Sequence, residues 1–235
     1  MCPTTADGKQ VFLSTTNGEH WRSVSNGLPE SAIYSLAVSG TNIFAGLHRY
    51  GVFLSMNNGA SWRAVNSGLV ESPFGGIVVY DLLASRDQVY AGTNSGLFRS
   101  ANSGTSWSRA SAGMREGTSV HEIAKSGPNL IVVNLGYGSR VYLSKNNGVH
   151  WTEITKRFPL KTSVNSFAES GGHLFAGGDD GHVFRSIDHG ESWKLLESKL
   201  PGGADVSCLA ARGRSLFAGS RYAGFFLSTD RGATW

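Results

Sequence analysis

Two carboxylates have the type and placement needed for acid–base chemistry. Asp81 and Glu122 occupy matching positions in neighbouring apolar segments, which we predict to be inner strands of successive sheets. Hydrolysis of a glycosidic bond by inversion or retention requires two carboxyl groups roughly 5–10 Å apart. Carboxylates that alternate with apolar residues on such strands also hydrate a channel without doing chemistry. We favour this structural role, and we keep Asp81 and Glu122 as the one catalytic pair to test.

A second set of residues could bind a ligand rather than transform it. Aromatic rings stack on sugar faces, and neighbouring polar groups hold hydroxyls or peptide groups, so turns that carry both are candidate binding loops. The candidates in the turns between second and third predicted strands are His48, Arg49, Tyr50, Tyr137, Arg140, Asp179, Asp180, Arg221 and Tyr222. The same residue types make up any solvated loop rim, and we weigh that interpretation above a specific site.

An internal sequence repeat predicts the strands and turns that position these residues. All six tryptophans end the same frame, Ser-x-(Asp/Asn)-x-Gly-x-x-Trp, and they recur every 41 to 45 residues. The frame residues are Ser14, Gly18, Trp21, Ser55, Asn57, Gly59, Trp62, Ser100, Asn102, Gly104, Trp107, Ser144, Asn146, Gly148, Trp151, Ser186, Asp188, Gly190, Trp193, Ser228, Asp230, Gly232 and Trp235. A period of this length is typical of the four-stranded blade of a β-propeller.

Each period contains four short apolar segments separated by glycine turns. In one period they are residues 33–37, 43–46, 52–55 and 62–65, rich in β-branched and aromatic residues, and we predict strands of about 4–6 residues. The fold class is therefore all-β, a propeller of four-stranded antiparallel blades with about five to six repeats. We divide the single domain into a partial blade 1–30, blades 31–70, 71–115, 116–160 and 161–202, and a partial blade 203–235.

The frame itself is predicted to be a structural hairpin between the third and fourth strands. Its glycine supplies a positive φ that other residues resist. The Asp or Asn accepts hydrogen bonds from nearby backbone N–H groups, and the tryptophan packs between sheets. The frame residues are therefore interpreted as scaffold and not as a site.

The frame resembles the Asp-box, or BNR, repeat of sialidases, xyloglucanases, sortilin-type receptors and photosystem II assembly-factor-like propellers. Three copies carry Asn57, Asn102 or Asn146 in place of Asp, and the first carries Thr16, which suggests a looser first hairpin. The resemblance implies the fold but not one function, because these families share a hairpin and differ in chemistry. It implies an extracytoplasmic location, although the N-terminus has no apolar segment of a signal peptide. The Phe/Tyr-Arg-Ile-Pro element of sialidases is absent.

Composition excludes several classes of protein. With 31 glycines, 40% hydrophobic and only 16% charged residues, the chain is neither disordered nor collagen-like. The 21 Lys and Arg residues are scattered and the net charge is only +4, so we expect no nucleic-acid partner. No apolar run is long enough for a membrane-spanning helix. Neither cysteine nor histidine spacing indicates a metal, and we expect no cofactor.

The number of predicted strands is compatible with two interpretations of the propeller ring. It gives two strands before the first full unit, four units of four strands, and three strands at the end. A five-blade ring would close if segment 21–24 completed the last blade. We favour instead a fragment of a propeller with six or more blades, whose open edges invite self-association.

These features together predict a non-catalytic binding or protein-interaction module, with a protein or glycan ligand on the loop face, in a larger secreted or envelope protein. The alternatives are a glycoside hydrolase of sialidase or xyloglucanase type, and a protein-binding factor similar to the photosystem II assembly factors.

Overall fold

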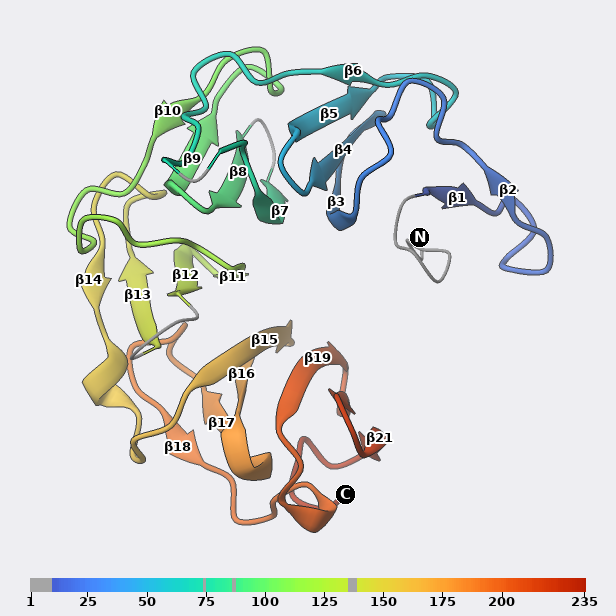
Figure 1. Ribbon diagram of the computed structural model, residues 1–235. Coiled ribbons are helices and arrows are strands. Elements are labelled where there is room, and N and C mark those ends of the chain that lie inside the picture. The colour runs from blue at the N-terminus through green and yellow to red at the C-terminus, as the bar shows by residue number, and fades with distance from the viewer. Residues whose placement is uncertain (1–9, 74, 86–87, 135–138) are drawn as a thin grey trace. The chain divides into compact units, whose positions relative to one another are not determined.

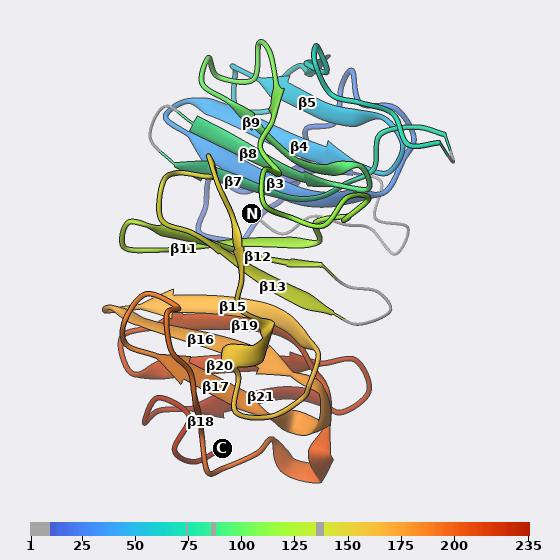
Figure 2. The same cartoon turned by 90° about the vertical axis from the view of Figure 1, so that its left-hand side faces the viewer.

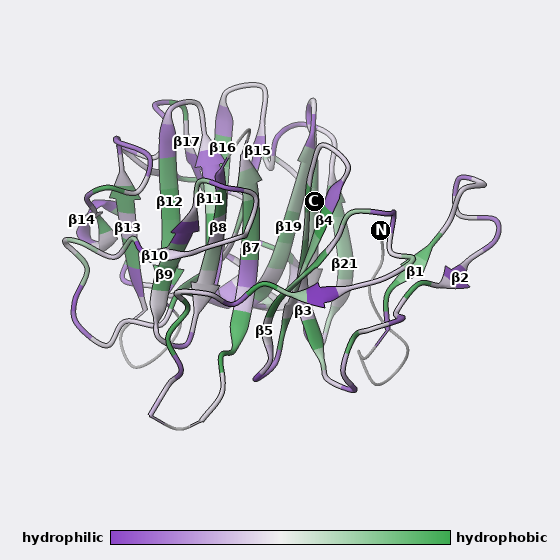
Figure 3. Cartoon of the chain, turned by 90° about the horizontal axis from the view of Figure 1, so that it is seen from above, coloured by the Kyte–Doolittle hydropathy of each residue, from purple (hydrophilic) through white to green (hydrophobic). Residues whose placement is uncertain are grey.

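The computed structural model describes residues 10–73, 75–85, 88–134 and 139–235, and these form two compact units. Unit 1 comprises Met1–Ala110 and Gly117–His121, and unit 2 comprises Ser111–Glu116 and Glu122–Trp235. Every described strand pairs antiparallel with its neighbour in the chain. The hydrophobic residues concentrate along the strands, and hydrophilic residues dominate the connections (Figure 3).

Unit 1 contains one two-stranded and two four-stranded sheets (Figure 1). The two-stranded sheet pairs β1 (Phe12–Leu13) with β2 (Arg22–Ser23). The next sheet contains β3 (Ile33–Ser39), β4 (Asn42–Leu47), β5 (Gly51–Ser55) and β6 (Arg63–Ala64). The third contains β7 (Val79–Ser85), β8 (Gln88–Thr93), β9 (Gly96–Ser100) and β10 (Ser108–Arg109). In unit 1, β2 thus pairs with β1.

Unit 2 contains two four-stranded sheets and one three-stranded sheet. The first is β11 (Glu122–Ser126), β12 (Asn129–Asn134), β13 (Arg140–Ser144) and β14 (Thr152–Glu153), followed by the 3-10 turn η1 (Thr155–Arg157). The second is β15 (Val164–Ser170), β16 (His173–Gly178), β17 (Val183–Ser186) and β18 (Lys194–Leu195), with η2 (Asp179–Gly181) between β16 and β17. After η3 (Pro201–Gly203), β19 (Val206–Arg212), β20 (Ser215–Ser220) and β21 (Gly224–Ser228) form the last sheet (Figure 2).

The fourth strands are shorter than the sequence predicts. Each is only two residues long, whereas the pattern predicted at least four. The fourth strand can end early because a side chain that follows it accepts a hydrogen bond from the third strand, in place of a backbone carbonyl. Asn66 Oδ1 accepts the Val52 N–H at 2.7 Å, and Thr155 Oγ1 accepts the Val141 N–H at 3.0 Å. The N–H groups of the third strand therefore keep an acceptor, and the chain after the fourth strand can turn toward the next sheet.

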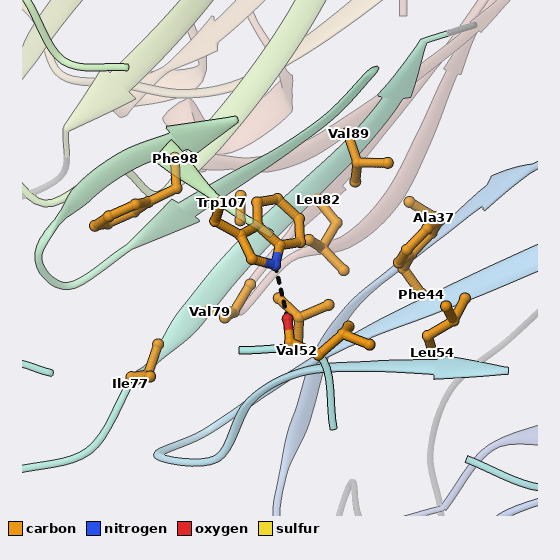
Figure 4. Packing of buried hydrophobic residues seen from close by; sticks show 12 residues of the cluster. Ala37, Phe44, Val52, Leu54, Ile77, Val79, Leu82, Val89, Phe98 and Trp107 are labelled. Atoms are coloured by element: carbon orange, nitrogen blue, oxygen red, sulfur yellow. Dashed lines mark hydrogen bonds between the residues drawn. The ribbon is translucent and has the colours of Figure 1, made fainter. Parts of the chain in front are cut away.

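The core lies between successive sheets of each unit. In unit 1 the side chains of β4 and β5 pack against those of β7, β8 and β9, with Phe44, Val79, Phe98 and Trp107 buried (Figure 4). In unit 2 one cluster joins the β11–β14 sheet to the β15–β18 sheet, and another joins the latter to the β19–β21 sheet. Together with the consecutive antiparallel order, this packing is that of an all-β propeller fold, as predicted.

Candidate functional site

The repeat hairpins satisfy their own polar groups. In the hairpin after β5, Ser55 Oγ accepts the Gly59 N–H at 2.8 Å and donates to Asn57 Oδ1 at 3.0 Å. Asn57 Oδ1 also accepts the Ser61 N–H at 2.9 Å. Gly59 has a φ of +83°, as predicted, and Asn58 before it is also left-handed, at +54°. The same serine and Asp or Asn contacts recur in the four later hairpins. These contacts close each hairpin.

The first hairpin makes the same turn with a hydroxyl in place of a carboxylate or amide. Thr16 Oγ1 accepts the His20 N–H at 2.9 Å, and Ser14 Oγ accepts the Gly18 N–H at 2.8 Å. The hydroxyl of Thr16 thus takes over the central acceptor role. That this hairpin is looser than the others stays a prediction.

Four of the hairpin tryptophans are buried against a sheet, but Trp21 is not. The indole N–H of Trp62 donates to the Val24 carbonyl at 2.7 Å, next to the preceding sheet of unit 1. The indole N–H of Trp107 donates to the Val65 carbonyl, also at 2.7 Å (Figure 4). Trp21 is 46% exposed, and its indole N–H donates to Gly18 of its own hairpin at 2.9 Å. The expectation that every tryptophan packs between sheets is therefore wrong for Trp21, because no earlier described sheet covers it.

Asp81 is engaged within unit 1 as a link between inner strands. Ser35 Oγ on β3 donates to Asp81 Oδ1 on β7 at 2.9 Å, and it accepts the Leu82 N–H at 3.0 Å. A β-bulge between Val79 and Asp81 turns the carboxylate toward β3. The side chain therefore joins two sheets by hydrogen bonds.

Glu122 makes the equivalent link within unit 2. Its Oε1 accepts the Phe167 N–H at 2.6 Å and the Ser166 hydroxyl at 3.1 Å, both on β15. Ser166 Oγ in turn accepts the Leu209 N–H on β19 at 3.0 Å. In each unit the predicted catalytic carboxylate is thus a partner in an inter-strand hydrogen-bond network.

A row of aromatic rings accompanies Asp81 in unit 1. Tyr34 stacks with Tyr80 at a centroid distance of 6.1 Å, and Tyr80 stacks with His121 at 4.2 Å. His48 contacts the other side of Tyr34 at 5.7 Å. Burial lowers the pKa of His121, and burial followed by the neighbouring Tyr34 raises the pKa of Tyr80. Both shifts favour the neutral forms of these two rings.

The other binding candidates of unit 1 lie in the turn between β4 and β5. Arg49 has a φ of +70° and is exposed, while Tyr50 presents about half of its surface to solvent. Gly76 allows the backbone of a neighbouring loop to approach this turn, since a Cβ there would lie 2.8 Å from Arg49 Cβ. His48, Arg49 and Tyr50 thus form a polar rim beside the aromatic row.

Unit 2 contains a cleft that three predicted binding residues share. Arg140, Asp179 and Asp180 line a space of about 710 Å³, together with the segment that connects β14 to β15. Asp179 Oδ1 accepts from Asn165 Nδ2 at 3.0 Å, and the Asp180 N–H donates to Asp205 Oδ1 at 3.0 Å. These contacts fix the acidic wall of the cleft on η2.

The rest of the cleft lining is mixed, with charged and apolar side chains. Arg140 forms an ion pair with Glu153 at 2.8 Å, and Lys156 and Lys161 add exposed positive charge. Phe158 is buried and stacks on Trp193 at a centroid distance of 4.6 Å, while the neighbouring Leu160 is 38% exposed. A ligand in this cleft would meet apolar side chains together with side chains of both charges.

The remaining candidates lie elsewhere. The Arg221 guanidinium lies 5.6 Å from the ring centroid of Tyr222, which is almost fully exposed, and neither residue lines the cleft. Tyr137 lies outside the described residues. The structure therefore brings together Arg140, Asp179 and Asp180 but not Arg221 and Tyr222.

Sequence reasoning missed two sets of residues. The first is the connection that supplies Lys156, Phe158, Leu160 and Lys161, although basic residues flanking a Phe-Pro-Leu triplet are an amphipathic signal. The second is the pair Tyr80 and His121. Tyr80 and His121 immediately precede Asp81 and Glu122 in the sequence. The comparison of repeats that gave the two carboxylates could therefore have given these two rings as well.

Within the described ranges, no three His, Cys, Asp or Glu side chains gather closely enough to hold a metal ion. Of the helices in that part of the chain, none has the length and hydropathy to cross a bilayer.

Comparisons with known proteins agree with the class that the sheets define, a β-propeller domain. Residues 115–235, just over half of the chain, match the DUF6242 beta propeller domain. The chain therefore belongs to this family of β-propeller domains. No curated protein matches it.

Solved structures are similar in fold. The GH74 xyloglucanase from Xanthomonas campestris is 18% identical with a TM-score of 0.74, over 95% of this chain and 41% of that one. YCF48 bound to D1 peptide is 16% identical with a TM-score of 0.73, over 96% of this chain and 73% of that one. YCF48 from Cyanidioschyzon merolae is 14% identical with a TM-score of 0.70, over 96% and 77% of the two chains. The chain thus spans less than half of the xyloglucanase, and such identities establish the fold alone.

Proposed function

We propose that the chain is a non-catalytic, protein-binding propeller module whose repeats are Asp-box hairpins, and that it holds an extended peptide segment in the cleft of unit 2. The observation that carries this proposal is the composition of that cleft, whose lining combines the apolar residues Phe158, Pro159 and Leu160 with both basic and acidic side chains. That the module forms part of a larger secreted or envelope protein stays a prediction.

The cleft suits a peptide because it offers both kinds of contact that a peptide needs. Its volume of about 710 Å³ falls within the roughly 300–1,000 Å³ of ordinary ligand sites. The exposed part of Leu160 can pack against an apolar side chain, and Lys161 and Asp180 can pair with charges of either sign. The similarity in fold to YCF48, a structure of which holds a D1 peptide, supports a protein ligand.

The engagement of both carboxylates supports the absence of catalysis. A general acid or a nucleophile must be free to approach the glycosidic oxygen or carbon. Asp81 and Glu122 instead accept hydrogen bonds from a neighbouring strand within their own units.

Selection of a random-sequence twelve-residue peptide library on the intact protein tests the ligand class. We expect selected peptides to lose at least tenfold in affinity for the double variant Leu160→Asp, Lys161→Glu, because it removes the apolar contact and reverses a wall charge. Lys199→Glu is the matched control, since Lys199 is exposed in unit 2 but does not line the cleft. Peptides that bind the wild type, the double variant and the Lys199→Glu control equally would contradict the assignment of the cleft as the peptide site.

Three alternatives have their own readouts. A glycan array that yields a ligand sensitive to the same double variant, with no peptide selected, would replace the protein ligand by a glycan. Turnover of a chromogenic glycoside that Asp81→Asn or Glu122→Gln abolishes would support a glycoside hydrolase, in line with the fold similarity to the GH74 xyloglucanase. A single defined protein partner recovered in a pull-down would favour an assembly factor. Self-association through open sheet edges is also retained as a proposal.

A further inference from the structure

The turn that follows the last strand of a sheet contains a glycine in the first three repeats but not in the fourth. Six residues after the tryptophan of each repeat, the chain has Gly27, Gly68 and Gly113, and then Arg157. The three glycines have φ values of +92°, +92° and +90°, as the third residue of a type II turn requires. Arg157 instead has a right-handed backbone within η1 (Thr155–Arg157). The fourth repeat therefore uses a different turn.

Each of the three glycine turns contacts the next tryptophan along the chain. The backbone N–H of that tryptophan donates to the carbonyl that precedes the glycine. The donor and acceptor pairs are Trp62 and Asn26, Trp107 and Ser67, and Trp151 and Ala112, at 3.0, 2.8 and 2.8 Å. A Cβ on Gly27 would lie 2.6 Å from the Trp62 carbonyl oxygen, and one on Gly68 or Gly113 would lie closer still to its own tryptophan. Only glycine therefore allows this contact.

The turn at Arg157 does not contact Trp193 in this way. A right-handed third residue flips the central peptide of a turn relative to type II, so the carbonyl before it points to the other side. Within the described ranges, the Trp193 N–H accordingly makes no hydrogen bond to the Lys156 carbonyl. The buried indole nitrogen of Trp193 also has no acceptor among the described residues, and neither has that of Trp235, before which Lys199 replaces the glycine.

The backbone of η1 explains why the indole of Trp193 lacks an acceptor. In unit 1 the indole acceptors are the carbonyls of Val24 and Val65, and the equivalent residue here is Ile154. Ile154 has a ψ of 10°, and its carbonyl accepts the Arg157 N–H at 2.8 Å. A buried donor without an acceptor costs stability, and proteins retain such a cost where the local arrangement serves a function.

The arrangement at this turn is part of the cleft of unit 2. The connection contributes residues on both sides of Arg157 to the lining, namely Thr155, Lys156 and residues 158–163. Arg157 itself does not line the cleft. Its guanidinium donates to the Glu191 carbonyl, in the hairpin of Trp193, at 3.1 Å. A side chain therefore links the connection to this hairpin, where the glycine turns use the backbone.

We propose that Arg157 is a positioning residue for the cleft, because it keeps the turn in its 3-10 form and so directs the connection into the cleft lining. This inference rests on the proposed peptide-binding function of the cleft. The role belongs to the backbone conformation and not to the charge. Any residue with a Cβ at position 157 should therefore keep the cleft open, and only glycine should let the turn close on Trp193.

Two substitutions of the same residue test this role. Arg157→Gly restores the residue of the other turns, and we expect peptides selected on the wild type to bind it at least about tenfold more weakly, as when only a tenth of the molecules keep the cleft open. Arg157→Ala is the matched control, since it removes the guanidinium and its contact with Glu191 but retains a Cβ. Its peptide affinity should equal that of the wild type.

The indole N–H of Trp193 gives a readout that needs no peptide. Nuclear magnetic resonance of the protein with isotope-labelled tryptophan shows the indole N–H signals, and Trp193→Phe identifies the signal of Trp193. In Arg157→Gly this signal should shift downfield and its hydrogen exchange should slow, because the Ile154 carbonyl becomes its acceptor. In Arg157→Ala it should stay at its wild-type position. The melting temperature of Arg157→Gly should rise, because a buried donor gains a partner.

The outcomes separate this inference from the proposed function. If no peptide is selected but Arg157→Gly alone shifts the Trp193 signal and raises the melting temperature, the peptide ligand is wrong and the control of the turn by residue 157 stands. Equal losses of affinity in Arg157→Ala and Arg157→Gly would overturn the proposal, since the guanidinium would then act directly. An Arg157→Gly protein that binds peptide as the wild type does, keeps the wild-type Trp193 signal or fails to fold would overturn it as well.

Discussion

The second strands of the β15–β18 and β19–β21 sheets contain the same four-residue sequence, but these residues differ in burial. Leu174-Phe175-Ala176-Gly177 and Leu216-Phe217-Ala218-Gly219 both form such a strand. Phe175 is 1% exposed and packs with residues of the following sheet, whereas Phe217 is 48% exposed. The repeat therefore determines which residues share a face of a sheet, while the next sheet determines whether that face is buried.

The largest difference is expected from truncating these two phenylalanines. Phe175→Ala should reduce the free energy of unfolding by about 3–5 kcal/mol, because it leaves a cavity between two packed sheets. Phe217→Ala should change it by only about 0.5 kcal/mol, as at other solvent-facing positions. Urea unfolding followed by circular dichroism measures both values.

Equal losses for the two phenylalanine variants would contradict the comparison, since they would mean that Phe217 is covered in solution.

An intermediate effect is expected at the tryptophans. Trp107→Phe should destabilise by about 1–3 kcal/mol, because it removes the hydrogen bond to the Val65 carbonyl and leaves that acceptor buried without this donor. Trp21→Phe should lie within about 0.5 kcal/mol of wild type, since Trp21 is largely exposed. Thermal melts of the two variants test the difference, and a large cost at Trp21 would show that its hairpin is covered.

The smallest effect concerns the acid dependence of one hairpin. Burial raises the pKa of Asp188, but hydrogen bonds from Ser192 and Ser186 outweigh burial and lower the pKa to about 2. The folded chain therefore binds this proton less tightly than the unfolded chain, so the carboxylate stabilises the fold above about pH 4 and loses that contribution as the pH falls toward 2. Because the side chain is partly exposed, the contribution should stay below about 1 kcal/mol.

Asp188→Asn should accordingly flatten the loss of stability between pH 4 and 2 and change little at pH 7. The Asn57 hairpin supports the second expectation, because its amide donates to the Ser61 hydroxyl at 2.9 Å and keeps the turn closed. Asn146→Asp offers the reverse test in another hairpin. Urea midpoints measured across this pH range would contradict the assignment if Asp188→Asn and wild type lost stability in parallel.

Much of the fold could be predicted because the repeat acts through local geometry. Ser55, Asn57 and Gly59 close a turn by contacts within five residues, so their spacing alone predicts the hairpin. The length of the fourth strands could not be predicted in this way. It depends on Asn66 and Thr155 reaching back to another strand, and polar residues of these types are equally common in ordinary loops.

The candidate site was only partly predictable, for a similar reason. Arg140, Asp179 and Asp180 follow from their places in turns, but the cleft also needs Phe158 and Leu160 from a connection whose path no periodicity describes. The carboxylates illustrate the reverse case. Their positions on inner strands were predicted, whereas the serines that engage them, Ser35 and Ser166, are ordinary strand residues in the sequence.

The serine links also have a dynamic consequence. The amides of Leu82 and Leu209 donate to serine hydroxyls of the adjacent sheet, at 3.0 Å in both cases, and the Leu82 amide also donates to Asp81 Oδ1 of its own strand at 2.8 Å. The Leu209 amide therefore becomes accessible to solvent deuterium when the adjacent sheet moves away, even if its own strand stays intact, whereas the Leu82 amide keeps an acceptor in its own strand. Hydrogen exchange at Leu209 would therefore report the separation of neighbouring sheets. Hydrogen bonds between inner strands thus couple each sheet to its nearest neighbour, and a series of such couplings makes several sheets unfold cooperatively.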